Sequence, residues 1–148
     1  MKQTKAYNCG PASMIYWMRK MGAPECMIPS IDSIEVAVKC QPEQGTRPEN
    51  MARWLHDRFP VLAYGYGCTD EGGYDSSKPQ TPYIFLWQDT DGDEESGHYS
   101  VCIREEKRHM RILDPYTGRE RWLSKSMFLR NWKCKWYGER WALWYPKG

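Results

Sequence analysis

Residues 8–24 read NCGPASMIYWMRKMGAP, and this stretch predicts the first helix of the chain, over residues 9–21. Its apolar residues recur at close to helical spacing, which is typical of a helix that buries a face. Asn8 is a residue type that caps helices, and Pro11 suits a first turn, where its missing N–H breaks no hydrogen bond. The glycine and proline near the end of the stretch stop the helix.

Helical patterns fill the first part of the chain, and strand patterns fill the rest. Further helices are predicted over residues 31–40 and 49–56, with Thr46 as a candidate cap for the second of them. After Pro60 the sequence changes to apolar runs of strand length, at residues 61–66, 83–87, 98–103, 110–113 and 141–145. A short helix is predicted over 124–132. Helices before strands favour an α+β fold, in which N-terminal helices pack on a C-terminal antiparallel sheet.

The composition is that of one folded domain over residues 1–148. Lys plus Arg is 21 and Asp plus Glu is 19, so the net charge is only +2. This balance provides no electrostatic basis for binding nucleic acid or an anionic membrane surface. The apolar stretches are short and interrupted by charges, so we expect no membrane insertion. No apolar signal-peptide core follows Met1, and we therefore expect a cytoplasmic protein.

The chain has six cysteines, and no two of them form a CxxC motif. This spacing excludes the signatures of zinc ribbons and thioredoxins, and we expect free thiols. Cys9 differs from the others because it lies at the predicted start of the first helix. The unpaired N–H groups and the dipole of a helix N-terminus favour a thiolate, the form of cysteine that acts as a nucleophile. Gly10 beside it would let another segment of the chain approach closely.

A nucleophilic cysteine also needs a base, a group that orients the base, and donors for an oxyanion. Of the three histidines, His98 begins a predicted strand, and Asp114 ends the strand that we expect to pair with it. The two residues should therefore be neighbours in a hairpin. Gln3, six residues before Cys9, could donate a side-chain N–H to an oxyanion, beside the backbone N–H of Cys9.

Three segments together resemble the peptidase C39-like family of papain-like cysteine peptidases. They are Gln3-x5-Cys9-Gly10-Pro11-Ala12-Ser13, Gly97-His98-Tyr99-Ser100-Val101 and Ile112-Leu113-Asp114-Pro115-Tyr116-Thr117-Gly118. The family includes the domains of bacteriocin-exporting ABC transporters that cleave leader peptides after a double glycine.

The resemblance implies a papain-like fold and hydrolysis of a peptide bond in a peptide or protein substrate. It makes Cys9 the nucleophile, His98 the general base and acid, Asp114 the residue that orients His98, and Gln3 the oxyanion donor. It suggests cleavage after small residues such as Gly-Gly, and it implies no metal or organic cofactor.

Two other functions fit the same residues. A papain-like fold can also carry an amidase, an isopeptidase or an acyl transferase, because the fold does not determine the acceptor of the acyl group. The same fold could also serve as a non-catalytic module that binds peptides. A slow, ordinary Cys9 thiol would distinguish this module from the enzymes.

Two further features have less specific patterns. The acidic stretch 89–95 faintly resembles a calcium-binding loop, but its glycine falls in the wrong register for an EF-hand, so a solvated acidic hairpin is favoured. A group of tryptophans near the C-terminus could line a peptide groove, although most of them are expected in the core: Trp122, Trp132, Trp136, Trp141 and Trp144.

Overall fold

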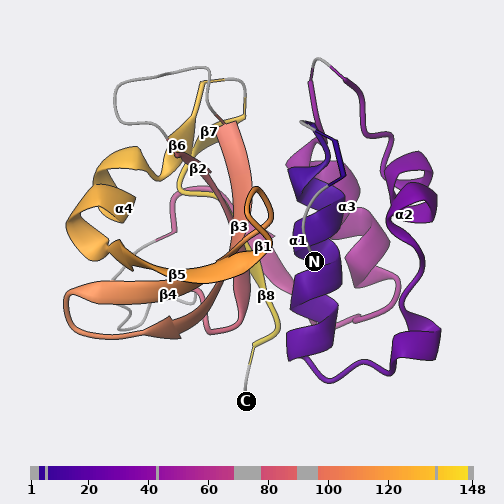
Figure 1. The fold of residues 1–148 in the computed structure, drawn as a ribbon, viewed down its shortest axis with the longest axis horizontal. Helices are drawn as coiled ribbons and strands as arrows, with labels where there is room; N and C mark the ends of the chain where they lie inside the picture. Colours follow the sequence, from indigo (N-terminus) through magenta and orange to yellow (C-terminus); the bar gives the residue numbers. More distant parts are fainter. Residues whose placement is uncertain are drawn as a thin grey trace.

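Three N-terminal helices lie beside a β-sheet in the computed structural model of the chain (Figure 1). The structure describes residues 4–5, 7–42, 44–68, 78–89, 97–135 and 137–146. The order of helices before strands agrees with the sequence prediction. The helices are α1 (Cys9–Lys20), α2 (Ile31–Ala37) and α3 (Pro48–His56), with a short 3-10 helix, η1 (Glu25–Met27), between the first two.

The main sheet is antiparallel, in the strand order β1-β8-β2-β3-β4-β5. Its strands are β1 (Ala63–Gly65), β2 (Tyr83–Gln88), β3 (Gly97–Glu105), β4 (His109–Asp114), β5 (Arg119–Ser124) and β8 (Ala142–Trp144). Helix α4 (Lys125–Asn131) follows β5, and a small separate pair is formed by β6 (Lys133–Cys134) and β7 (Gly138–Glu139). The predicted α+β class, with helices packed on an antiparallel sheet, is confirmed.

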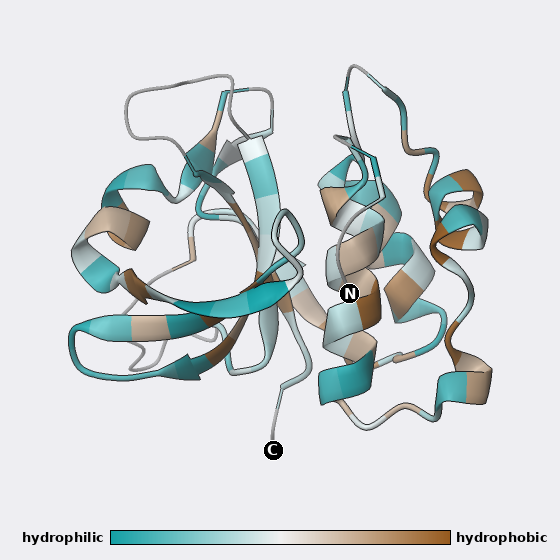
Figure 2. Ribbon diagram, viewed as in Figure 1, coloured by the Kyte–Doolittle hydropathy of each residue, from teal (hydrophilic) through white to brown (hydrophobic). Residues whose placement is uncertain are grey.

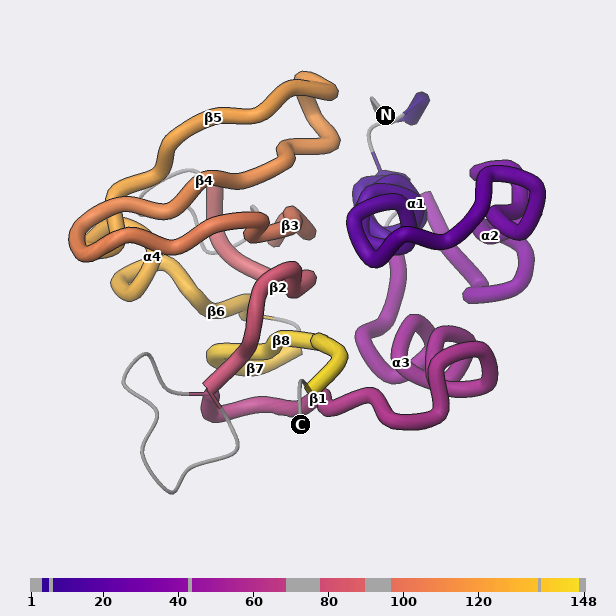
Figure 3. The backbone as a smooth tube through the Cα atoms, turned by 90° about the horizontal axis from the view of Figure 1, so that it is seen from below, coloured from indigo at the N-terminus to yellow at the C-terminus, as the bar shows by residue number. Residues whose placement is uncertain are grey.

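Helix α1 is central to the fold because it is covered on nearly every side. All of its residues from Cys9 to Met18 are buried. Figure 3 shows α1 between the sheet and α2, with α3 on the same side of the sheet. Trp17 is fully buried, donates its indole N–H to the carbonyl of Pro82 at 2.9 Å, and packs edge-on against Phe59. Because the first ten residues of α1 are enclosed, Cys9 at the start of the helix lies against the first residues of β3.

Strand β2 is buried on both faces, which explains its unbroken apolar run. Ile84 and Leu86 belong to the core beneath α1, whereas Phe85 belongs to a second core and packs edge-on against Phe128 of α4. The edge strand β5 is different: it is largely exposed and charged, and Figure 2 shows it as hydrophilic. Charged residues on an edge strand discourage pairing with other chains.

Several elements are shorter than predicted, and two of them are shortened by more than two residues where the backbone changes direction. The helix expected over 31–40 ends at Ala37, and Lys39 has a φ of 56°, in the left-handed region that an α-helix of L-residues does not continue through. The strand expected over 61–66 is confined to β1, and Gly67 just beyond it has a φ of 73°. Within the described residues, no helix combines the length and the apolar character needed to cross a lipid bilayer.

Candidate active site

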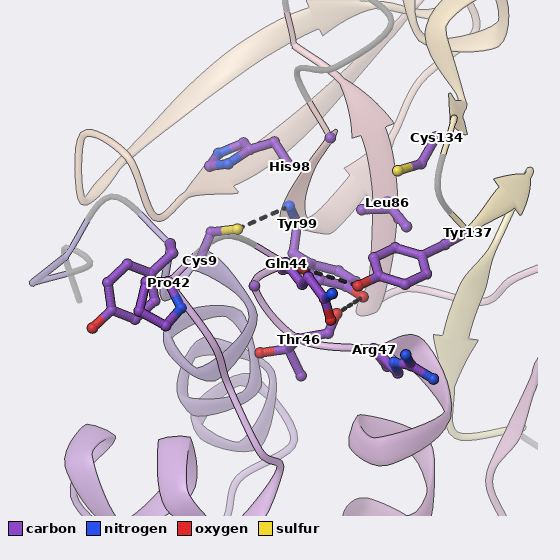
Figure 4. A pocket seen from close by; sticks show the side chains of 13 residues that line it. Cys9, Pro42, Gln44, Thr46, Arg47, Leu86, His98, Tyr99, Cys134 and Tyr137 are labelled. Carbon is purple, nitrogen blue, oxygen red and sulfur yellow. Dashed lines mark hydrogen bonds between the residues drawn. The ribbon is translucent and has the colours of Figure 1, made fainter.

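A pocket of about 610 Å³ opens where the start of α1 meets the start of β3 (Figure 4). Cys9 and His98 both line it. Its other walls come from the loop between α2 and α3 and from the segment around β6 and β7. The other two histidines, His56 and His109, are exposed and do not line the pocket.

Cys9 is the first residue of α1, and its side chain is at the pocket wall with 8% of the residue exposed. Its Sγ accepts a hydrogen bond from the backbone N–H of Tyr99 at 3.5 Å. A Cβ at Gly10 would lie 3.0 Å from the Cβ of Thr46. The segment that approaches closely is therefore the loop carrying Thr46, and this loop can pack on the first turn of α1 because residue 10 has no side chain. Thr46 itself does not cap α3, whose N-cap residue is Arg47.

Asn8 occupies the N-cap position of α1, as predicted, and its carbonyl accepts a hydrogen bond from the N–H of Ala12, but its side chain makes no capping hydrogen bond. Its Oδ1 instead accepts a hydrogen bond from the backbone N–H of Lys5 at 3.0 Å, and its Nδ2 donates to Oγ1 of Thr4 at 2.8 Å. The buried Asn8 side chain thus secures the segment before the helix. The N–H groups of the first turn therefore donate no hydrogen bond to the Asn8 side chain. They form the positive end of the helix dipole, and Cys9 lies at this end.

His98 and Asp114 lie side by side, joined by a 2.8 Å contact between Nε2 and Oδ1. Both residues are buried, with 6% and 4% exposed. The contact uses Nε2, so Nδ1 is the ring nitrogen that remains for a second partner. The ring of His98 lies beside Cys9 (Figure 4). The antiparallel hairpin of β3 and β4 thus brings together the two residues that the sequence placed at its ends.

Opposing effects act on the protonation of this pair. Burial disfavours a charged imidazolium, but the charge of Cys9 and the hydrogen bond with Asp114 outweigh it and raise the pKa of His98 to about 10. Burial also opposes ionisation of Asp114. Here His98, the backbone N–H of Tyr116 and the charge of Arg121 prevail and lower the pKa of Asp114. At neutral pH the arrangement favours an imidazolium next to a carboxylate.

The far wall of the pocket is a loop tied to the rest of the molecule by two tyrosines. The Tyr99 hydroxyl donates to the carbonyl of Thr46 at 2.6 Å, and the Tyr137 hydroxyl donates to the carbonyl of Gln44 at 2.9 Å. Gln41 and Gly45 exchange backbone hydrogen bonds of 2.8 and 2.7 Å, which close the loop into a tight turn. Tyrosines therefore shape this wall, and the sequence analysis did not identify them. Tyr99 could have been noticed as the residue after His98, whereas the role of Tyr137 depends on a contact between residues far apart in the sequence.

Several predicted features lie elsewhere or outside the described residues. Gln3 and Trp136 are outside them, as is most of the acidic stretch 89–95, of which only Asp89 is described. Three of the candidate groove tryptophans are in the core: Trp132, Trp141 and Trp144. A fourth, Trp122, lies on β5 and is 45% exposed. The described residues contain no group of three or more His, Cys, Asp or Glu side chains that could hold a metal ion.

Gly97, the residue before His98, should be intolerant of a side chain. A Cβ there would lie 2.8 Å from Sγ of the buried Cys134 but 3.9 Å from its Cβ. We expect Gly97→Ala to reduce the free energy of unfolding by about 1–2 kcal/mol, because the buried Cys134 side chain must move to make room for the methyl group. Urea unfolding would measure it. In a Cys134→Ala background, which removes the sulfur, adding Gly97→Ala should cost much less stability than it does in the original protein. An equal loss in both backgrounds would contradict the proposed clash.

Comparisons with known proteins identify the fold. No protein-family profile and no curated protein sequence matches the chain. Among solved structures, a double-glycine motif protease from an AMS/PCAT transporter, in complex with its leader peptide, aligns with a TM-score of 0.71 at 16% identity, over 97% of this chain and 87% of that one. The peptidase domain of Streptococcus ComA, a bifunctional ABC transporter involved in quorum sensing, aligns with a TM-score of 0.72 at 18% identity, over 99% and 97%.

The chain therefore has the papain-like fold of C39 double-glycine peptidase domains. The resemblance noted in the sequence is confirmed at the level of the fold. At 16% and 18% identity the likeness extends to the course of the backbone and no further.

Proposed function

We propose that the chain is a cysteine peptidase that hydrolyses a peptide bond through a thioester on Cys9. The observation that carries this proposal is the 2.8 Å contact between His98 and Asp114 in a pocket that Cys9 enters from a helix N-terminus. The two neighbours in fold are peptidases, and one of them was solved with a bound leader peptide, which supports a peptide as substrate.

In the proposed reaction, the Cys9 thiolate attacks the carbonyl carbon of the scissile bond. The backbone N–H of Cys9 and the side chain of Gln3 are the proposed donors to the oxyanion. As the C–N bond breaks, the His98 imidazolium gives its Nδ1 proton to the leaving amine, and a thioester results. Neutral His98 then takes a proton from water, the resulting hydroxide attacks the thioester, and the C–S bond breaks. This releases the carboxylic acid and restores the thiolate and imidazolium, while Asp114 stays ionised and orients the ring.

An extended substrate segment would have room beside the pocket. A second cavity shares Arg47 and Tyr137 with the first and continues along α3 as far as Arg53. We propose that a peptide lies along both cavities. Small residues such as Gly-Gly next to the scissile bond fit the tyrosine-walled pocket, where Tyr99 and Tyr137 are fixed by hydrogen bonds to the loop.

The decisive experiment is the pH dependence of alkylation by iodoacetamide, followed at each cysteine by peptide mass spectrometry. Only thiolates react, and an ordinary thiol with a pKa near 8.5 is less than about 1% ionised at pH 6. We expect Cys9 to react at least about tenfold faster than the exposed Cys26 at pH 6. His98→Ala should abolish this advantage, because no imidazolium then balances the thiolate.

If Cys9 reacts no faster than Cys26 at pH 6, the result would contradict the proposed peptidase activity and support a non-catalytic peptide-binding module. Fast alkylation followed by products joined to an added amine, and not to water, would indicate an acyl transferase. Mass spectrometry of the products distinguishes these two reactions.

A further inference from the structure

The carboxylate of Asp114 has two oxygens, and each has its own partners. Oδ1 contacts Nε2 of His98 at 2.8 Å and accepts a hydrogen bond from the backbone N–H of Tyr116 at 2.9 Å. Oδ2 accepts a hydrogen bond from Nε of Arg121 at 3.1 Å. The proposed reaction assigns a task to His98 and to Asp114, and it leaves Arg121 without one.

Sheet register explains how Arg121 reaches this carboxylate. In the β4–β5 pair, Asp114 lies opposite Arg119, and Ile112 lies opposite Arg121. Alternate residues of a strand share a face, so Arg121 lies diagonally across from Asp114 on the same face of the sheet. Its guanidinium also lies over the ring of Trp87, 5.4 Å from the centroid, and Trp87 pairs with His98 in the β2–β3 register. Two contacts therefore hold Arg121 in place beside the pair.

We infer that Arg121 is a positioning residue for the proposed reaction: it holds the second oxygen of Asp114 and limits how strongly His98 retains its proton. The inference rests on the proposed function, and it predicts the direction in which Arg121 changes the proton affinity of His98. A guanidinium next to the carboxylate offsets part of the negative charge that stabilises the imidazolium. His98 must give its proton to the leaving amine and then accept one from water, and too strong a hold on the proton would slow the first of these steps.

The charged and titratable groups near His98 and Asp114 come from separate elements. Helix α1 contributes Cys9, whose charge raises the pKa of His98, and Tyr16, whose own pKa is raised by burial and by Asp114. Strand β4 contributes Asp114, and β5 contributes Arg121. The Tyr116 ring lies 6.4 Å from the His98 ring, centroid to centroid. Arg121 is the cation that donates a hydrogen bond to Asp114, whereas Arg119, which lies opposite Asp114 in the β4–β5 register, is exposed.

The test measures the titration of His98 directly, by NMR of proteins with ¹⁵N-labelled histidine rings. It uses a Cys9→Ala background, because the charge of Cys9 also raises the pKa of His98 and would mask a smaller effect from Arg121. In this background, Arg121→Met should raise the proton affinity of His98 about three- to tenfold, a modest effect because Arg121 is 40% exposed. Arg121→Lys should restore most of the original value, because it returns the positive charge.

Arg111 provides a matched control on the neighbouring strand. It pairs with Glu120 at 2.7 Å and lies 5.2 Å from the centroid of Trp122, so it repeats the ion pair and ring contact of Arg121 without touching Asp114. Arg111→Met should leave the titration of His98 unchanged. An unchanged or lowered proton affinity in Arg121→Met, or an equal change in Arg111→Met, would overturn the inference. If Arg121→Met does not fold, Arg121→Gln is measured by the same criteria.

Failure of the proposed function gives a different result. It would appear as slow alkylation of Cys9 in the otherwise unchanged protein, whereas the effect of Arg121 is read from His98 alone. If Cys9 alkylates rapidly but Arg121→Met leaves the titration of His98 unchanged, the peptidase proposal stands and the role of Arg121 is rejected.

Discussion

Replacing Cys9 with alanine should reduce the rate of peptide hydrolysis more than about a thousandfold. The proposed thioester cannot form without the sulfur, and loss of a nucleophile typically removes most of the catalysis that an enzyme provides. The substrate for this assay is a leader-like peptide that carries Gly-Gly before the scissile bond, and cleavage is followed by mass spectrometry. The binding constant for the peptide should change little, because the variant keeps the rest of the pocket wall, including Tyr99 and His98.

Cys26 is the matched control for this substitution. It lies on the exposed turn η1, does not line the pocket, and is also a free thiol. Cys26→Ala should leave hydrolysis unchanged. Residual hydrolysis by Cys9→Ala at more than a tenth of the original rate would contradict a covalent mechanism at this residue.

Replacing Trp141 with alanine should lower the free energy of unfolding by about 3–5 kcal/mol, the usual cost of removing a buried aromatic side chain. Only 2% of Trp141 is exposed, and its ring packs edge-on against Tyr99 with centroids 5.8 Å apart. Urea unfolding followed by circular dichroism measures the loss. Because Tyr99 also holds the loop that bears Thr46, the variant should loosen the pocket wall as well.

Trp122→Ala is the control variant for this experiment. Trp122 is 45% exposed on the edge strand β5, and its loss should cost less than about 1 kcal/mol. Similar losses in the two variants would contradict the division of these tryptophans between core and surface. The same pair of variants also tests the idea of a tryptophan-lined groove, since a groove residue would affect peptide binding without such a loss of stability.

The main features of the fold could be predicted because they depend on local patterns. The apolar spacing of residues 9–21 specified a helix that begins at Cys9, and β2 was recognisable as an apolar run of strand length. Asn8 takes the predicted N-cap position, but its side chain does not form the capping hydrogen bond, because it has competing partners. Lys5 and Thr4 offer hydrogen bonds to the Asn8 side chain that the pattern of residue types does not reveal.

The candidate site also combines features that the sequence predicts with features that only the tertiary structure shows. By itself, the sequence determined that Cys9 starts a helix, that His98 lies at the start of one strand and that Asp114 lies at the end of the next, because helix starts and hairpin registers depend on residues close along the chain. Only the tertiary structure decided what surrounds them. Tyr137 reaches Gln44 across 93 residues of sequence, and Arg121 reaches Asp114 diagonally between strands. Such contacts depend on how the sheet twists and on how the helices pack on it, and side chains far apart in the chain meet only when the whole core has formed.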